Sequence, residues 1–297
     1  MKRFRPIEFE GWELSAMRFL FAIVVYVSIS TVVHEVSQPA PVGLARFWDF
    51  TFMADKQAMN WCRAVVAAGL VFYVVGRFVG PALLVVSFLV LGYGALKNSQ
   101  AALAGHSMQI VGLVLLAQTV YYVWHAVRAW IKRGTPGLPS MLDIHRGAAW
   151  IAMQTAVATY VVTAISKLYL SELSWLRNAK YFPVQLVKAQ KSEYYNTLEA
   201  PVVGDGIMDQ MVANLSVWFM ESPMICRTFL GTGLVLELVA FLALWGRKSA
   251  LAYGLMLVVF HLTISRVMSL TFDLNIYVLL IFLVNLPYWG GRVFMRR

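Results

Sequence analysis

A series of long apolar segments constrains this fold more than any other feature of the sequence. A membrane-spanning helix needs about 20 predominantly apolar residues, and about 17 are tolerated. Eight segments reach or approach this length: 17–33, 63–78, 81–96, 108–131, 147–170, 227–245, 250–265 and 272–289. Only 13% of the residues are charged, which is about half the share found in soluble domains. We therefore expect an all-α integral membrane protein, a bundle of about eight transmembrane helices forming a single polytopic domain over residues 1–297.

The loops between these segments indicate how the chain is oriented. The turn RFVGP alone separates the short segments 63–78 and 81–96, so this pair is compatible with two crossings or with one re-entrant hairpin. Basic residues in short loops mark the cytoplasmic side of a membrane. With a cytoplasmic N-terminus, that side holds Lys2, Arg3, Arg5, Arg77, Lys132, Arg133, Arg146, Arg247, Lys248, Arg292, Arg296 and Arg297. The pattern predicts that both termini are cytoplasmic, and a bacterial inner membrane is the expected location.

One long loop, residues 171–226, falls on the outer side in this topology. Two of its stretches, NAKYFPVQLVKAQ and DQMVANLSVWFMESP, are amphipathic and carry aromatic residues and methionine on one side. This pattern is typical of short helices that lie in the membrane interface. The loop is therefore predicted to contain interfacial helices.

The net charge of +10 does not require nucleic acid as a partner, because basic loops of membrane proteins attract anionic lipid. The two cysteines, Cys62 and Cys226, are far apart, which excludes a cysteine-based metal site and a redox CxxC motif. Two separate buried thiols are favoured over a disulfide. The lipid bilayer is the expected partner, and neither a metal nor nucleic acid is expected.

Four ionisable residues are the candidates for chemistry within this framework. Lys167 lies about one turn from the outer end of its segment, where its ammonium could also reach the lipid headgroups. Glu237 lies near the middle of its segment, too deep to reach water, and is expected to bond to a polar group on a neighbouring helix. His261 is typical of a hydrogen bond between helices, and His106 of an ordinary loop histidine. The topology nevertheless places Lys167, His106 and His261 on the outer side together, as an acid–base site requires.

Several short motifs resemble one known family. The pattern Tyr160, Ala164, Lys167, Leu168, Trp175 is similar to the lysine-bearing segment of vitamin K-dependent gamma-carboxylase and its bacterial relatives, the HTTM (horizontally transferred transmembrane domain) family. The segments LSAMRF, GHSM, GLVLEL and FHLTIS follow the family's order; they begin at Leu14, Gly105, Gly233 and Phe260. In one departure, Gly105 stands where the carboxylase has asparagine.

The resemblance implies that Lys167 is a base that deprotonates a reduced quinone of menaquinone or vitamin K type, with His106 assisting. Glu237 and His261 would be structural or assisting polar groups. The implied reaction is a quinol-dependent carboxylation of a peptide substrate, which is lyase-type chemistry. The alternative is a non-catalytic accessory subunit of a larger membrane protein complex, because folds are reused for other tasks.

Overall fold

The computed structural model describes residues 7–31, 33, 36, 43–100, 107–132, 137–184, 186, 207–268 and 270–295. This part of the chain is largely helical and contains no strand. It forms two compact units. Unit 1 comprises Met1–Val157, Leu242–Leu255 and Asp273–Arg297, and unit 2 comprises Ala158–Phe241 and Met256–Phe272.

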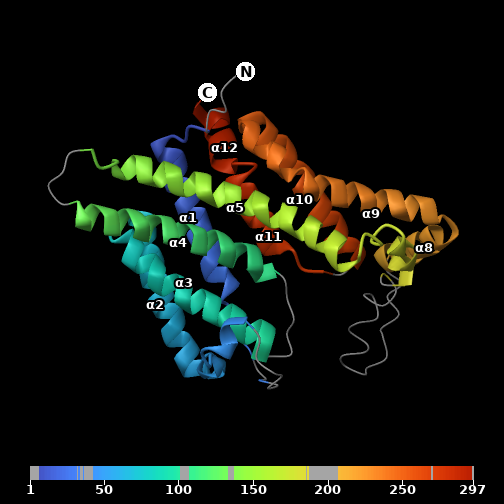
Figure 1. Cartoon of the computed structure of the whole chain (residues 1–297), viewed down its shortest axis with the longest axis horizontal. Helices are drawn as coiled ribbons and strands as arrows, with labels where there is room; N and C mark the ends of the chain where they lie inside the picture. Colours follow the sequence, from blue (N-terminus) through green and yellow to red (C-terminus); the bar gives the residue numbers. More distant parts are fainter. Residues whose placement is uncertain are drawn as a thin grey trace. The chain divides into compact units, whose positions relative to one another are not determined.

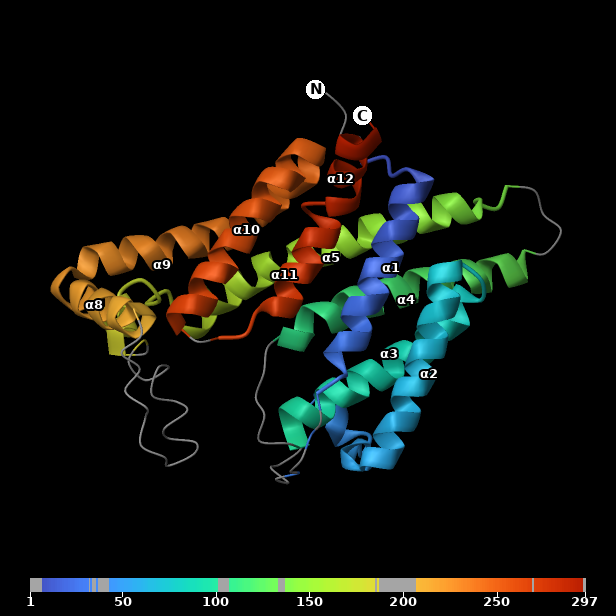
Figure 2. The same cartoon turned by 180° about the vertical axis from the view of Figure 1, so that it is seen from behind.

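The course of the chain can be followed in Figures 1 and 2. Unit 1 contains α1 (Gly11–Ser28), η1 (Gly43–Arg46), η2 (Thr51–Ala54), α2 (Lys56–Val75), α3 (Val79–Ala95), η3 (Leu96–Gln100), α4 (Ser107–Ile131), α11 (Asp273–Phe282) and α12 (Leu286–Met295). Unit 2 contains η4 (Asn178–Tyr181), α8 (Ile207–Glu221) and α9 (Pro223–Leu238). Helices α5 (Met141–Leu170) and α10 (Arg247–Met268) and the short η5 (Ala240–Trp245) contribute residues to both units.

Six helices of the described chain are long and apolar enough to cross a membrane: α1, α2, α3 continued by η3, α4, α5 and α10. Helices α11 and α12 meet at a 57° bend and would add one broken span. The predicted count of eight is therefore not confirmed. The missing span is α9, whose 16 residues extend over about 24 Å, short of the hydrocarbon thickness of about 30 Å.

The second and third spans are longer than the sequence pattern suggested. Helix α2 begins at Lys56, because the Asp55 carboxylate caps it by accepting from the Ala58 N–H at 2.8 Å. It ends at Val75, and the next residue, Gly76, has a φ of 81°, which suits glycine. The two segments contain 20 and 22 residues, so each can cross on its own. This length favours two crossings over one re-entrant hairpin.

Two arginines join α1 and α2 at their opposite ends. Arg18 of α1 donates to the Tyr73 carbonyl in the last turn of α2 at 3.2 Å. Arg63 of α2 donates to the Ile29 carbonyl at 3.1 Å and the Ser30 carbonyl at 2.7 Å, just beyond the end of α1. The last carbonyls of a helix lack partners within the helix and carry partial negative charge. Each helix therefore caps the C-terminus of the other.

A buried acid anchors the start of α1 in unit 1. Glu13 is fully buried, and its carboxylate accepts from Arg247 of α10 at 2.7 and 3.0 Å. Asn285, at the bend between α11 and α12, donates to the same carboxylate. The starts of α1 and α10 and the start of α12 are thereby held together.

Unit 2 has a small apolar core of its own. Its buried members are Ala179, Phe182, Leu186, Phe219 and Cys226. The Cys226 thiol donates to the Ala179 carbonyl at 3.0 Å, which ties α9 to η4, and both cysteines of the chain are free thiols. Helix α8 confirms a helix in the second amphipathic stretch of the long loop. In the first stretch, η4 covers Asn178–Tyr181, while residues 185 and 187–190 lie outside the described part of the chain.

Candidate functional site

The candidate site is built in unit 2 on one face of α5. Tyr160, Ala164 and Lys167 are spaced by four and three residues, so they lie on the same side of the helix. The Lys167 ammonium donates to Glu237 Oε2 of α9 at 2.6 Å. The lysine side chain is 28% exposed and the glutamate side chain only 5%. Glu237 was expected to bond to a polar group on a neighbouring helix, and that group is the candidate base Lys167.

Helix α9 can approach α10 closely because of a glycine one turn before Glu237. A Cβ atom at Gly233 would lie 2.5 Å from the Phe260 ring, so only glycine fits against that ring. His261 follows Phe260 in the chain and belongs to unit 2, as do both residues of the ion pair. Lys167 lies near enough to interact electrostatically with His261.

His261 has one bonded and one open ring nitrogen. Its Nε2 lies 2.7 Å from the Tyr160 hydroxyl, and Phe272 stacks on the ring with centroids 4.7 Å apart. The residue is only 4% exposed, yet Nδ1 has no hydrogen-bond partner among the described residues. Ser265, one turn further along α10, has a buried hydroxyl that is equally unpartnered in this part of the chain. Two buried polar atoms on one helix face thus lack a hydrogen-bond partner in the described chain.

The chain leaves α5 in a strained turn. Glu172 and Leu173 have φ values of 48° and 63°, a region that side-chain-bearing residues seldom adopt. The turn brings the Trp175 ring back over the Lys167 ammonium, 5.7 Å from its centroid. Strain of this kind persists where surrounding contacts impose it, and it clusters at functional sites.

These groups provide the elements of proton transfer. A lysine and a carboxylate joined by one short hydrogen bond can exchange a proton between an ion pair and a neutral pair. Low-dielectric surroundings bring the neutral pair closer in energy to the ion pair than it is in water. In the neutral pair the lysine is a free amine, which is the form that acts as a base.

Three of the four predicted site residues therefore come together: Lys167, Glu237 and His261. The fourth, His106, lies outside the described residues. Sequence reasoning missed the Tyr160–His261 hydrogen bond and Ser265, although the seven-residue spacing of Tyr160 and Lys167 is a visible signal. No group of three metal-binding side chains occurs in the part of the chain that the structure describes.

A second polar cluster, in unit 1, is closed. Arg18 lies 3.2 Å from His145 Nε2, whose Nδ1 lies 2.8 Å from the Tyr122 hydroxyl. The neighbouring cavity, also lined by Gln118, has a volume of about 10 Å³, which is room for a single water molecule. With Arg18 engaged at the end of α2, this cluster is best explained as structural.

No family model matches this chain, and the curated proteins and solved structures likewise give no significant match.

Proposed function

We propose that this protein is an integral membrane enzyme of the HTTM, gamma-carboxylase-like type, in which Lys167 acts as a base toward a reduced quinone. The observation that carries the proposal is the 2.6 Å contact between Lys167 and Glu237, with the lysine partly open and the acid buried. Glu237 accepts the lysine proton, and the resulting amine removes a proton from the hydroquinone hydroxyl.

The open polar atoms beside the ion pair support binding of such a ring. A hydroquinone presents hydroxyl groups that both donate and accept hydrogen bonds. His261 Nδ1 and the Ser265 hydroxyl are buried and without partners in the described chain, so they suit one of these groups. A lipid-tailed quinone of menaquinone or vitamin K type would enter from the bilayer, and a peptide would be the carboxylated substrate.

The proposal also places both termini on the cytoplasmic side of a bacterial inner membrane. Arg146, Arg247 and Arg292 belong to unit 1, and Arg146 and Arg247 bond to the segment that leads into α1. Their grouping supports a cytoplasmic start of α1. A fluorescent C-terminal fusion that lights up in the cytoplasm supports this orientation, and an active C-terminal alkaline phosphatase fusion contradicts it.

Quinone extraction from the purified protein tests the proposal most directly. Mass spectrometry of the extracted lipids should find a stoichiometric quinone in the parent and in Lys167→Arg, because arginine keeps the pairing with Glu237. The parent should consume added reduced menaquinone in the presence of oxygen. Lys167→Arg should not, since a guanidinium does not lose its proton in a protein. Equal consumption by Lys167→Arg would remove the base from the mechanism.

An accessory subunit is the second candidate, favoured by the exposed apolar surface of α8 and the start of α9. Met211, Val217, Trp218, Met220 and Met224 are all exposed there. Methionine and aromatic side chains are common in protein interfaces. In this case Lys167 and Glu237 form only a structural clamp, Lys167→Arg is fully functional in cells, and affinity purification recovers the same stoichiometric partner with both proteins.

A further inference from the structure

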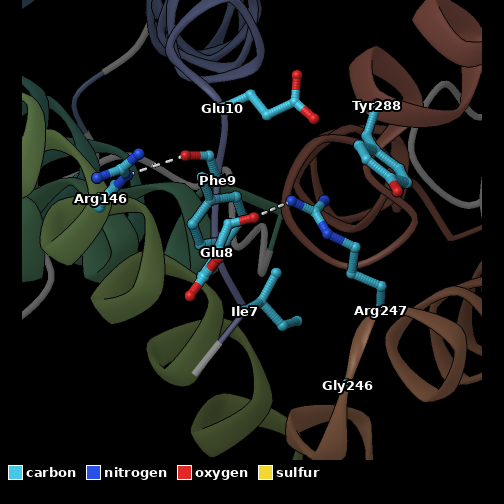
Figure 3. A pocket seen from close by; sticks show the side chains of 8 residues that line it. All are labelled: Ile7, Glu8, Phe9, Glu10, Arg146, Gly246, Arg247 and Tyr288. Carbon is cyan, nitrogen blue, oxygen red and sulfur yellow. Dashed lines mark hydrogen bonds between the residues drawn. The ribbon is translucent and has the colours of Figure 1, made fainter. Parts of the chain in front are cut away.

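Unit 1 contains a pocket that plays no part in the proposed function. It has a volume of about 360 Å³, within the range of small-molecule sites. It is lined by Ile7, Glu8, Phe9, Glu10, Arg146, Gly246, Arg247 and Tyr288. Figure 3 shows the guanidinium groups of Arg146 and Arg247 on opposite sides of the Glu8–Phe9 segment, each donating to a backbone carbonyl of that segment.

The two arginines differ in what they offer to a ligand. Arg247 is already neutralised by the buried Glu13 carboxylate, and its guanidinium stacks on the Tyr288 ring at 3.9 Å. The Arg146 side chain is 43% exposed, and its only ion pair among the described residues is with the exposed Asp143, at 3.3 Å. After its bonds to the Phe9 carbonyl and Asp143, this five-donor group still has N–H groups without a partner in the described chain.

The acidic side of the pocket is also open. Glu8 and Glu10 are exposed, and neither makes an ion pair in the described part of the chain. The Glu10 carboxylate accepts from the Trp12 indole at 2.6 Å and from the backbone N–H of Glu13 in the first turn of α1. The pocket thus presents one carboxylate without a hydrogen-bond partner in the described chain, that of Glu8, and one arginine with spare donors. A ligand that matches it carries a primary ammonium group and a phosphate a short distance apart.

The surroundings indicate that such a ligand comes from the membrane. The pocket lies where the membrane-crossing helices α1 and α10 begin, which is the depth of the lipid headgroups. Trp12 lies beside it, packed against Gly291, and indole rings favour this interface. Along α1, Trp12, Phe19 and Ile23 are exposed on one face and offer apolar surface to acyl chains.

We infer that this pocket binds the phosphoethanolamine head group of a phospholipid, with the ammonium on the Glu8 carboxylate and the phosphate on Arg146. The site would select phosphatidylethanolamine over phosphatidylcholine, whose trimethylated nitrogen has no N–H to donate. It would also select it over phosphatidylglycerol, which has no cation for the Glu8 carboxylate.

Native mass spectrometry of the delipidated protein, titrated with each of the three lipids, tests the inference. Phosphatidylethanolamine should bind about tenfold more tightly than the other two, the discrimination expected from charge-assisted hydrogen bonds. Glu8→Gln should abolish this preference, while Arg146→Gln should weaken phosphatidylethanolamine and phosphatidylcholine alike. Glu221→Gln and Arg128→Gln remove the same charges at exposed positions elsewhere and should leave the preference intact.

Glu8→Gln should fold like the parent, because the Glu8 side chain makes no hydrogen bond among the described residues. Similar affinity of the parent for all three lipids would overturn the inference, as would a preference that survives in Glu8→Gln. Soluble phosphoethanolamine is the last arm. If it binds as tightly as the lipid, the membrane source is wrong.

Discussion

The Tyr160 hydroxyl and His261 Nε2 lie 2.7 Å apart and join α5 to α10 inside unit 2. Because this contact occupies one ring nitrogen, it leaves Nδ1 as the ring nitrogen without a partner among the described residues. The contact thus fixes the orientation of the imidazole ring and links the two helices. This buried hydrogen bond should also stabilise the folded protein.

Tyr160→Phe should destabilise the protein by about 1–3 kcal/mol, because it strands a buried imidazole nitrogen without a partner. Thermal unfolding in detergent measures the loss. Tyr169→Phe is the matched control, since Tyr169 lies on the same helix and is 80% exposed. An unchanged unfolding temperature in Tyr160→Phe would show that the hydrogen bond contributes nothing.

Glu237→Gln should be milder than Glu237→Leu. The amide oxygen can still accept from the Lys167 ammonium, whereas leucine leaves the ammonium unpaired. We expect a loss of about 2–3 kcal/mol for leucine, below the figure for a fully buried pair because solvent reaches Lys167. Folded yield after detergent extraction and unfolding temperature report the difference. Equal tolerance of the two variants would rule out a structural contribution from the pair.

Replacing both partners separates stability from chemistry. Lys167→Met strands the Glu237 carboxylate and should destabilise the protein, but Lys167→Met combined with Glu237→Leu should recover much of the loss, because a matched apolar pair has no charge to desolvate. The double variant should still lack quinol turnover. A double-mutant cycle on unfolding free energies measures the coupling. Strictly additive losses would mean that the two side chains do not interact.

Much of unit 2's site could be predicted from the sequence, because a lone lysine, a deep acid and a histidine stand out in apolar segments. Their pairing could not. The contact between Lys167 and Glu237 depends on how α5 packs beside α9, and α9 proved too short for the span that the hydropathy of residues 227–245 suggested. Apolar composition locates helices, but it does not report where a helix stops.

The helix starts were missed for a related reason. Helix α1 begins at Gly11 rather than at residue 17, because the polar residue Glu13 is neutralised by Arg247, which is distant in sequence. Likewise α2 extends back to Lys56 through a polar first turn. An average of hydropathy along the sequence treats such polar residues as helix boundaries. In the folded protein, tertiary partners allow the same residues to lie within the helix.

Arg18 and Arg63, which cap the C-termini of α2 and α1, should each stabilise the helix pair. Arg63→Met should cost about 1–3 kcal/mol, because it removes charge-assisted hydrogen bonds to the carbonyls that end α1. Arg18→Met should cost a similar amount at the end of α2. The two sites serve opposite ends of the helix pair and share no partner, so the losses should add to within about 0.5 kcal/mol. Unfolding of both single variants, the double variant and the control Arg128→Met, at an exposed position of α4, gives the comparison. If either cap variant is as stable as Arg128→Met, that arginine is not a cap, and its presence in the span needs a functional explanation.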